Sequence, residues 1–177
     1  MQEQLLHFIW HRKLFRQEGL TTTQAHLVEI LHTGFPNQDQ GPDFLQARIR
    51  LDDELWAGHV EIHVRSSEWY QHGHEKDTHY NNVILHVVWT EDQPALTTTS
   101  VRIPCIELSG RVDASLLDRY HKLMNNEEWV PCASSLTSVP DITRTSWLER
   151  LMTERLESKT EYINQILARC SNDWEQA

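Results

Sequence analysis

The chain has 177 residues, of which 39% are hydrophobic and 24% are charged, a balance that is typical of a folded globular domain and excludes a disordered chain. No apolar run approaches the roughly 18–20 residues that a membrane-spanning helix needs. The net charge of −10 argues against a dedicated DNA-binding module, because such modules bind phosphates through cationic side chains, but it is compatible with an enzyme that reaches phosphates through a metal ion.

The first part of the chain predicts a helix that is followed by three strands. From Asp43 to Leu51, apolar and polar residues alternate with the period of two that marks a strand with one buried face. The polar turn Asp52-Asp53-Glu54 joins this strand to the next as a hairpin. We expect these elements in chain order: a helix over residues 3–16 and strands over 26–33, 43–51 and 55–65.

The second part predicts a central strand, an edge strand and helices. Residues 83–89 are almost continuously apolar, as in a strand that is covered on both faces. Pro104 lacks a donor for strand pairing and places its strand at a sheet edge, while Ser146 and Glu149 form a capping box. We expect a loop with a short helix near 75–81, strands over 83–89 and 101–108, a helix over 113–124 and a long helix from Ser146.

These elements predict a mixed α/β fold, with the order helix, three strands, short helix and strand, then an extra edge strand and C-terminal helices. We place the α/β core at residues 1–110 and a helical extension at 111–177. The long helix repeats apolar residues along one face, so we expect it to pack against the rest of the protein or against a second copy of the chain.

The cysteines indicate a reducing compartment. Cys105, Cys132 and Cys170 are widely spaced and form no CxxC pair, which argues against a disulfide framework and against a cysteine-based zinc site. The N-terminus has no basic segment ahead of its apolar residues and no small-residue cleavage site, so we expect no signal peptide. A cytoplasmic location without a membrane partner is the expectation.

Histidine is the compositional outlier, with 11 copies, of which six fall between His59 and His86. In the strand over 55–65, His59, Glu61 and His63 are expected to share one face, because side chains alternate along a strand. A carboxylate between two imidazoles is a ligand set that divalent transition metals accept. The alternative is an ordinary solvent-facing side of a hairpin.

A second carboxylate is expected near this face. Asp43 opens the preceding strand, and the hairpin pairing places it close to the His59–His63 end of its neighbour. Carboxylates on adjacent strands can share a hard cation, since magnesium and manganese prefer oxygen ligands. The alternative is that Asp43 serves only as a turn or capping residue after Pro42.

The polar segment that follows can support such a site. His72, His74, Asp77 and Tyr80 lie in the predicted loop and short helix, and the alternative is a solvated loop with incidental histidines. His86 lies inside an apolar strand, where a hydrogen-bonded core histidine is expected rather than a ligand.

Two resemblances add to these patterns. The string GPDFLQARIRLDDELWAGHVEIHVRSSEWYQHGHEKDTHYNNVILHVVW resembles an uncharacterised bacterial family, domain of unknown function family 2851, and the segments WLERLMTERLESKTEYI and NDWEQ resemble it too. The match covers most of the chain. Members of that family extend further, so this resemblance implies an N-terminal portion of a longer protein, and it implies no activity.

The second resemblance is remote and concerns Pro42-Asp43, the hairpin, and Glu61-Ile62-His63. This arrangement is similar to the motif of the PD-(D/E)xK nuclease superfamily, whose restriction-endonuclease-like core has the predicted order of elements. The resemblance implies that the carboxylates of Asp43 and Glu61 and the carbonyl of Ile62 hold a divalent metal, magnesium or manganese, for phosphodiester hydrolysis on nucleic acid.

His63 stands where that superfamily has lysine. Histidine is mostly neutral near pH 7, so it can serve as a general base or as a metal ligand, and imidazole favours manganese or zinc. The replacement is equally compatible with a nuclease scaffold that has lost its activity.

Three functions therefore stay open. The first is a metal-dependent, nuclease-like phosphodiester hydrolase that uses Asp43, Glu61 and His63. The second is a zinc-dependent hydrolase of another kind, and the third is a non-catalytic binding or scaffold module. The residues that would support the first are His59, His74, Asp77 and Tyr80, and the ligands of the second would be His59, His63, His72 and His74.

Overall fold

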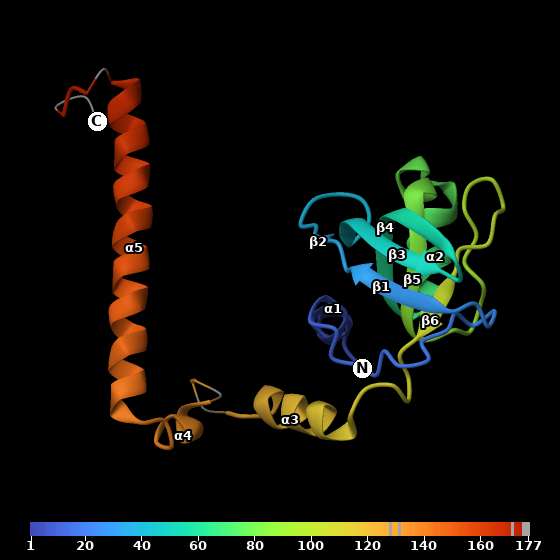
Figure 1. Ribbon diagram of the computed structural model, residues 1–177, viewed down its shortest axis with the longest axis horizontal. Helices are drawn as coiled ribbons and strands as arrows, with labels where there is room; N and C mark the ends of the chain where they lie inside the picture. Colours follow the sequence, from blue (N-terminus) through green and yellow to red (C-terminus); the bar gives the residue numbers. More distant parts are fainter. Residues whose placement is uncertain (128, 131, 171, 175–177) are drawn as a thin grey trace. The chain divides into compact units, whose positions relative to one another are not determined.

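The computed structural model describes residues 1–127, 129–130, 132–170 and 172–174. The chain divides into two compact units, Met1–Arg119 and Tyr120–Ala177 (Figure 1). The first unit contains a six-stranded sheet, and the second is helical. Among the described residues, no helix combines the length and apolar character that crossing a membrane requires.

The sheet of the first unit has the order β1-β3-β4-β5-β6, with β2 paired to β3 beside it. β1, β3 and β4 are antiparallel neighbours, whereas β4, β5 and β6 run parallel. The predicted mixed α/β fold and its order of helix, three strands, helix, strand and edge strand are confirmed. The elements of this unit are α1 (Glu3–His11), β1 (Val28–His32), β2 (Phe35–Pro36), β3 (Phe44–Leu51), β4 (Glu54–Arg65), α2 (Glu68–Gln71), the 3-10 helices η1 (His74–Lys76) and η2 (Thr78–Asn82), β5 (Val83–Thr90) and β6 (Cys105–Glu107).

Two predicted helices have other bounds in the structure. α1 ends at His11 instead of residue 16, because Lys13 takes a left-handed φ of 52° that no α-helix continues through. The short helix expected near 75–81 is replaced by α2, which begins seven residues earlier, and by η1 and η2. Gly73, with φ 76°, separates α2 from η1, so the segment turns instead of forming one helix.

The helical part contains α3 (Ala114–Met124), α4 (Ala133–Leu136) and α5 (Asp141–Arg169), the long red and orange helix of Figure 1. The predicted start of α5 at Ser146 is wrong, because the helix begins directly after Pro140, whose fixed φ suits the residue that precedes a helix. Its apolar residues Leu148, Met152 and Leu156 are more than half exposed. The predicted contact of this helix with a second copy of the chain stays a prediction.

The core of the first unit is built on α1 and the central strands. α1 buries Leu6, Ile9 and Trp10, and the Trp10 indole donates to the carbonyl of Thr33 at 3.0 Å. In β5 every side chain from Val83 to Val88 is buried, as the apolar run predicts. Burial of each large apolar side chain stabilises the fold by about 2 kcal/mol, which anchors the strands on which the site is built.

A serine–aspartate clamp ties α2 to the loop after β5. Asp92 accepts hydrogen bonds from the Ser67 amide at 2.8 Å and from the hydroxyls of Ser66 and Ser67 at 3.0 and 2.9 Å. The Ser66 hydroxyl in turn accepts from the amides of Asp92 and Gln93, each at 2.9 Å. α2 carries the fully buried Trp69. The clamp therefore positions the segment that leads into the histidine-rich turn.

Replacement of Asp92 by alanine is expected to lower the free energy of unfolding by about 1–3 kcal/mol, because three donors lose one acceptor. Burial raises the pKa of Asp92, but the hydrogen bonds from Ser67 and Ser66 outweigh it and hold the pKa below 3.8. This contribution to stability is thus present above about pH 3.8 and is lost as the pH falls through the lowered pKa. Urea unfolding of both proteins between pH 3 and pH 7 measures it.

Asp53→Ala is the matched control, since Asp53 is exposed in the β3–β4 turn, and its effect is expected to stay within about 0.5 kcal/mol. Equal stability of Asp92→Ala and the unsubstituted protein at pH 7 would contradict the clamp.

Candidate metal site

The antiparallel pairing of β3 and β4 brings Asp43 and Glu61 together. Asp43 directly precedes β3, and its neighbour Phe44 pairs with Val60 in the middle of β4. The Asp43 amide donates to Glu61 Oε2 at 3.1 Å, and the Ile62 amide donates to Asp43 Oδ2 at 2.9 Å. Each carboxylate is therefore held by the backbone of the other strand, as the hairpin predicts.

His59 does not join this pair. A bulge interrupts the pairing between Phe44 and Ala47, and at this bulge Gln46 has a left-handed φ of 58°. The Gln46 amide donates to His59 Nδ1 at 3.3 Å, so the imidazole is bound at the bulge. In the part of the chain that the structure describes, no contact joins His59 to Glu61 or His63. The structure therefore does not bring His59 together with the other predicted site residues.

Four histidines form a cluster beside Glu61, and two of them, His63 and His74, contact its carboxyl group. His63 Nε2 lies 3.6 Å from Glu61 Oε1 and 3.1 Å from His72 Nδ1, and its Nδ1 lies 2.8 Å from His86 Nε2. His74 Nε2 lies 3.2 Å from Glu61 Oε1. Glu61 and His63 are only 4% and 1% exposed, so the predicted polar face of β4 is a buried polar cluster rather than a solvent-facing surface.

Two aromatic side chains, Tyr80 and Trp69, pack against His74 of the cluster. Tyr80 stacks on His74, with ring centroids 3.8 Å apart, and Trp69 meets His74 edge-on at 5.2 Å. Asp77 lies elsewhere: its carboxylate accepts from the His79 amide and lies 2.7 Å from His79 Nδ1. Tyr80 therefore contacts His74 directly, whereas the Asp77 side chain acts on the His74 ring through its charge and the Asp77 amide donates to the His74 carbonyl at 3.2 Å.

The helix α1 adds His7, a residue that was not predicted from the sequence pattern. His7 Nε2 lies 3.3 Å from Asp43 Oδ2, and its ring packs edge-on against Phe44 with centroids 5.8 Å apart. Burial lowers the pKa of His7, but Asp43, Glu3 and Glu61 outweigh it and raise the pKa. The sequence feature that could have indicated His7 is its position four residues after Glu3, which places both side chains on one side of the helix.

The electrostatics of the cluster fit a bound cation. Burial, and then the nearby Asp43, raise the pKa of Glu61 to about 9. Burial also lowers the pKa of His63 to about 2, assisted by His86, and that of His86 to about 3, assisted by His74. A carboxyl group that stays protonated near neutral pH thus lies beside neutral imidazoles with lone pairs to donate, and a divalent cation would favour the ionised form of Glu61.

Unsatisfied polar atoms point the same way. The ring nitrogen His74 Nε2 is buried and has no hydrogen-bond partner among the described residues, although Glu61 Oε1 is 3.2 Å away, and the buried His7 Nε2 lies 3.3 Å from Asp43 Oδ2 in poor hydrogen-bond geometry. Buried polar atoms without a partner are rare in folded proteins. Asp43, Glu61 and the Ile62 carbonyl can supply the oxygen ligands of a hard cation, and the histidines can supply nitrogen ligands.

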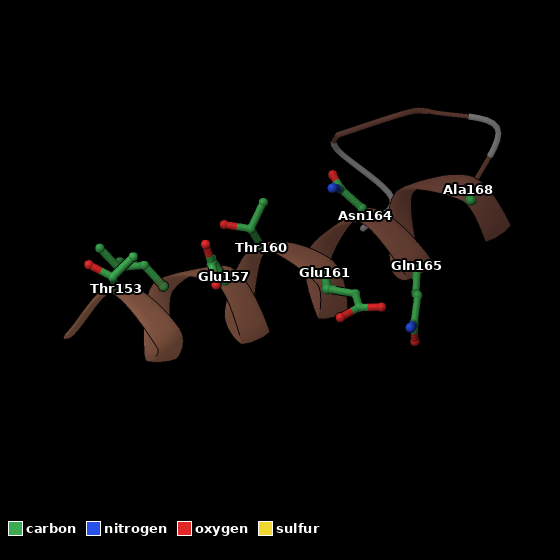
Figure 2. A pocket seen from close by; sticks show the side chains of 8 residues that line it. Thr153, Glu157, Thr160, Glu161, Asn164, Gln165 and Ala168 are labelled. Carbon is green, nitrogen blue, oxygen red and sulfur yellow. The ribbon is translucent and has the colours of Figure 1, made fainter. Parts of the chain in front are cut away.

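A separate hollow lies along α5 and has a different character. All eight residues that line it come from this one helix. Figure 2 shows the side chains of Glu157, Glu161, Asn164 and Gln165 leaving the helix in different directions. Ionisable groups do not converge there from separate elements. The cluster on β4 is therefore the better candidate for chemistry.

Comparison with known proteins identifies a family. Residues 3–177 match the family described as "Protein of unknown function (DUF2851)", so the chain belongs to this family, as its sequence indicates. No curated protein and no solved structure matches the chain.

Glu61→Gln is expected to stabilise the metal-free protein at high pH. Since the pKa of Glu61 is raised from 4.5 to about 9, its favourable contribution is present below pH 4.5 and is lost as the pH rises through 9. In EDTA, the unsubstituted protein should lose on the order of a few kcal/mol over this window relative to Glu61→Gln. Urea unfolding at pH 5 and pH 8.5 measures the difference.

The matched control is Glu54→Gln at the exposed start of β4, which should show no such gain at pH 8.5. A Glu61→Gln protein that is less stable than the unsubstituted one at pH 8.5 would contradict the assignment of a buried, strained carboxylate.

Proposed function

We propose that this member of the DUF2851 family is a metal-dependent phosphodiester hydrolase that acts on nucleic acid in the cytoplasm. The observation that carries the proposal is the meeting of Asp43 and Glu61 on neighbouring antiparallel strands, each held by the other's backbone. Two fixed carboxylates at one place are what a magnesium or manganese ion requires.

The topology around this pair supports the nuclease-like assignment. Without the two-residue strand β2, the order is α1, β1, β3, β4, α2 and β5, with the first three strands antiparallel and the last parallel to β4. Asp43 precedes the second of these strands, and Glu61-Ile62-His63 lies in the third. The resemblance to the PD-(D/E)xK motif implies the same two positions.

The chain's own residues would divide the work as follows. Asp43, Glu61 and the Ile62 carbonyl would hold the cation, and their mutual hydrogen bonds keep the carboxylates in place before it binds. The bound ion would lower the pKa of a water molecule and stabilise the charge that develops on phosphorus. His7 lies beside Asp43 and can donate a hydrogen bond to it or to a phosphate oxygen.

The reaction would be a simple hydrolysis. The oxygen of water bonds to phosphorus, one ester P–O bond breaks, and a proton from the water reaches the leaving oxygen. His63 is buried and neutral, so it cannot supply the fixed positive charge of the lysine that it replaces. A positive charge that stabilises the phosphate at this position would have to come from another group.

Asp43→Asn is expected to lower metal-dependent cleavage by about 100-fold or more, because it removes the charge of a ligand and leaves the shape of the side chain. The assay uses the purified chain, Mn²⁺ or Mg²⁺, and labelled single-stranded and double-stranded oligonucleotides. Mn²⁺ should also raise the melting temperature of the unsubstituted protein, since a ligand that binds the folded state stabilises it by RT ln(1 + [L]/Kd).

Asp53→Asn, in the exposed β3–β4 turn, is the control and should retain both effects. Absence of cleavage together with absence of a Mn²⁺ effect on melting would leave the non-catalytic scaffold as the better function. Cleavage that survives in Asp43→Asn would contradict the assigned ligand.

A further inference from the structure

We infer that His63, His72 and His74 bind a second divalent cation, of the zinc type, with Glu61 Oε1 as a ligand shared with the first site. Binding of this cation does not depend on nuclease activity, because the ligand set is complete in itself. Only its role beside a phosphate, given below, rests on the proposed function.

Three of the six distances between the proposed ligand atoms match a tetrahedral centre. With metal–ligand bonds of 2.0–2.1 Å, adjacent ligand atoms in a tetrahedral zinc site lie about 3.3 Å apart. The contacts from His63 Nε2 to His72 Nδ1 and to Glu61 Oε1 are 3.1 and 3.6 Å, and His74 Nε2 lies 3.2 Å from Glu61 Oε1. One ring nitrogen from each histidine lies within 4.8 Å of those of the other two.

The orientation of His74 gives an independent indication. Its side chain is 10% exposed, and Nε2 is buried without a hydrogen-bond partner in the described part of the chain, although Glu61 Oε1 is 3.2 Å away. A hydrogen bond requires the donor to point at the acceptor. Ligand atoms around one cation point at a common centre instead, as in the close but unbonded pair of His74 Nε2 and Glu61 Oε1. His63 Nε2 and His72 Nδ1 lie in hydrogen-bond geometry without the cation, and the cation would replace that hydrogen bond.

The backbone turn at Gly73 explains how two nearby histidines reach one place. His72 caps the end of α2 and His74 begins η1, so residues two apart would face different directions if the helix continued. The left-handed φ of 76° at Gly73 reverses the chain between them. The ring centroids of His63, His72 and His74 consequently form a near-equilateral triangle with sides of 5.0, 5.4 and 5.4 Å.

A second layer of residues orients the histidines. His86 Nε2 lies 2.8 Å from His63 Nδ1, and when Nδ1 carries the proton, the lone pair of His63 Nε2 faces the proposed cation. Tyr80 stacks on His74 and Trp69 packs at its edge, which limits the rotation of that ring. Metal-binding histidines in proteins usually have a hydrogen-bond partner at the other ring nitrogen, as His63 has in His86.

The donor set selects the kind of metal. Three imidazoles and one carboxylate favour zinc, whereas Asp43, Glu61 and a carbonyl favour magnesium or manganese. A cation bound at His63 would place positive charge where the resembling nucleases have lysine. The histidine-bound ion would thus replace the fixed charge that His63 itself does not carry.

Metal titration of the EDTA-treated protein tests the inference. Co²⁺ serves as a probe with visible absorption, and we expect one equivalent to give the intense bands of a tetrahedral site, which Zn²⁺ then displaces. His72→Ala should weaken Zn²⁺ binding by about 100-fold or more, and His74→Ala by a similar factor. His72 is exposed, so its replacement leaves the core intact, and circular dichroism checks the fold of both variants.

His79→Ala is the matched control, because His79 is 80% exposed and pairs with Asp77 outside the cluster, and it should bind Zn²⁺ as the unsubstituted protein does. The inference is wrong if Co²⁺ gives no tetrahedral bands, or if His72→Ala and His79→Ala bind Zn²⁺ equally. Asp43→Asn separates the two proposals: it should lose the Mn²⁺ effect and keep Zn²⁺ binding within about threefold. Zn²⁺ binding without any nucleic acid cleavage would reject the nuclease and retain this site.

Discussion

The buried carboxyl group of Glu61 connects all parts of the candidate site. Its Oε2 accepts a hydrogen bond from the Asp43 amide across the β3–β4 pair, and its Oε1 lies beside His63 and His74. One side chain therefore joins an oxygen-rich half and a nitrogen-rich half. A carboxyl group that is only 4% exposed and has Asp43 nearby is costly to ionise.

A well-packed fold can accommodate the free energy that an unfavourably buried carboxyl group costs, and Glu61 lies in such a fold. β4 lies between β3 and β5 and has antiparallel pairing on one side and parallel pairing on the other. The first unit buries around it Leu6, Ile9 and Trp10 of α1 and the β5 side chains from Val83 to Val88. Functional sites characteristically concentrate unfavourable charge on a rigid scaffold, because the charge is then compensated when the ligand binds.

The parts of the fold that the sequence predicted well depend on local patterns. The alternation in β3 and β4 and the short polar turn between them set which residues pair, so the meeting of Asp43 and Glu61 followed from the hairpin. The continuous apolar run of β5 and the proline before β6 placed a central and an edge strand correctly. Local patterns were less informative where the backbone leaves regular structure, as at Lys13 and Gly73.

The order of the elements, the family and the pair of carboxylates could be predicted, because each depends on residues that are neighbours or face each other across one turn. Which histidines belong to the site depends on contacts that form only when the chain folds. A bulge at Gln46 holds His59 apart, a left-handed glycine turns His72 and His74 toward His63, and the packing of α1 brings His7 to Asp43. These are contacts between distant segments and breaks in regular secondary structure. The side-chain periods of a strand (two residues) and of a helix (3.6 residues) do not predict them.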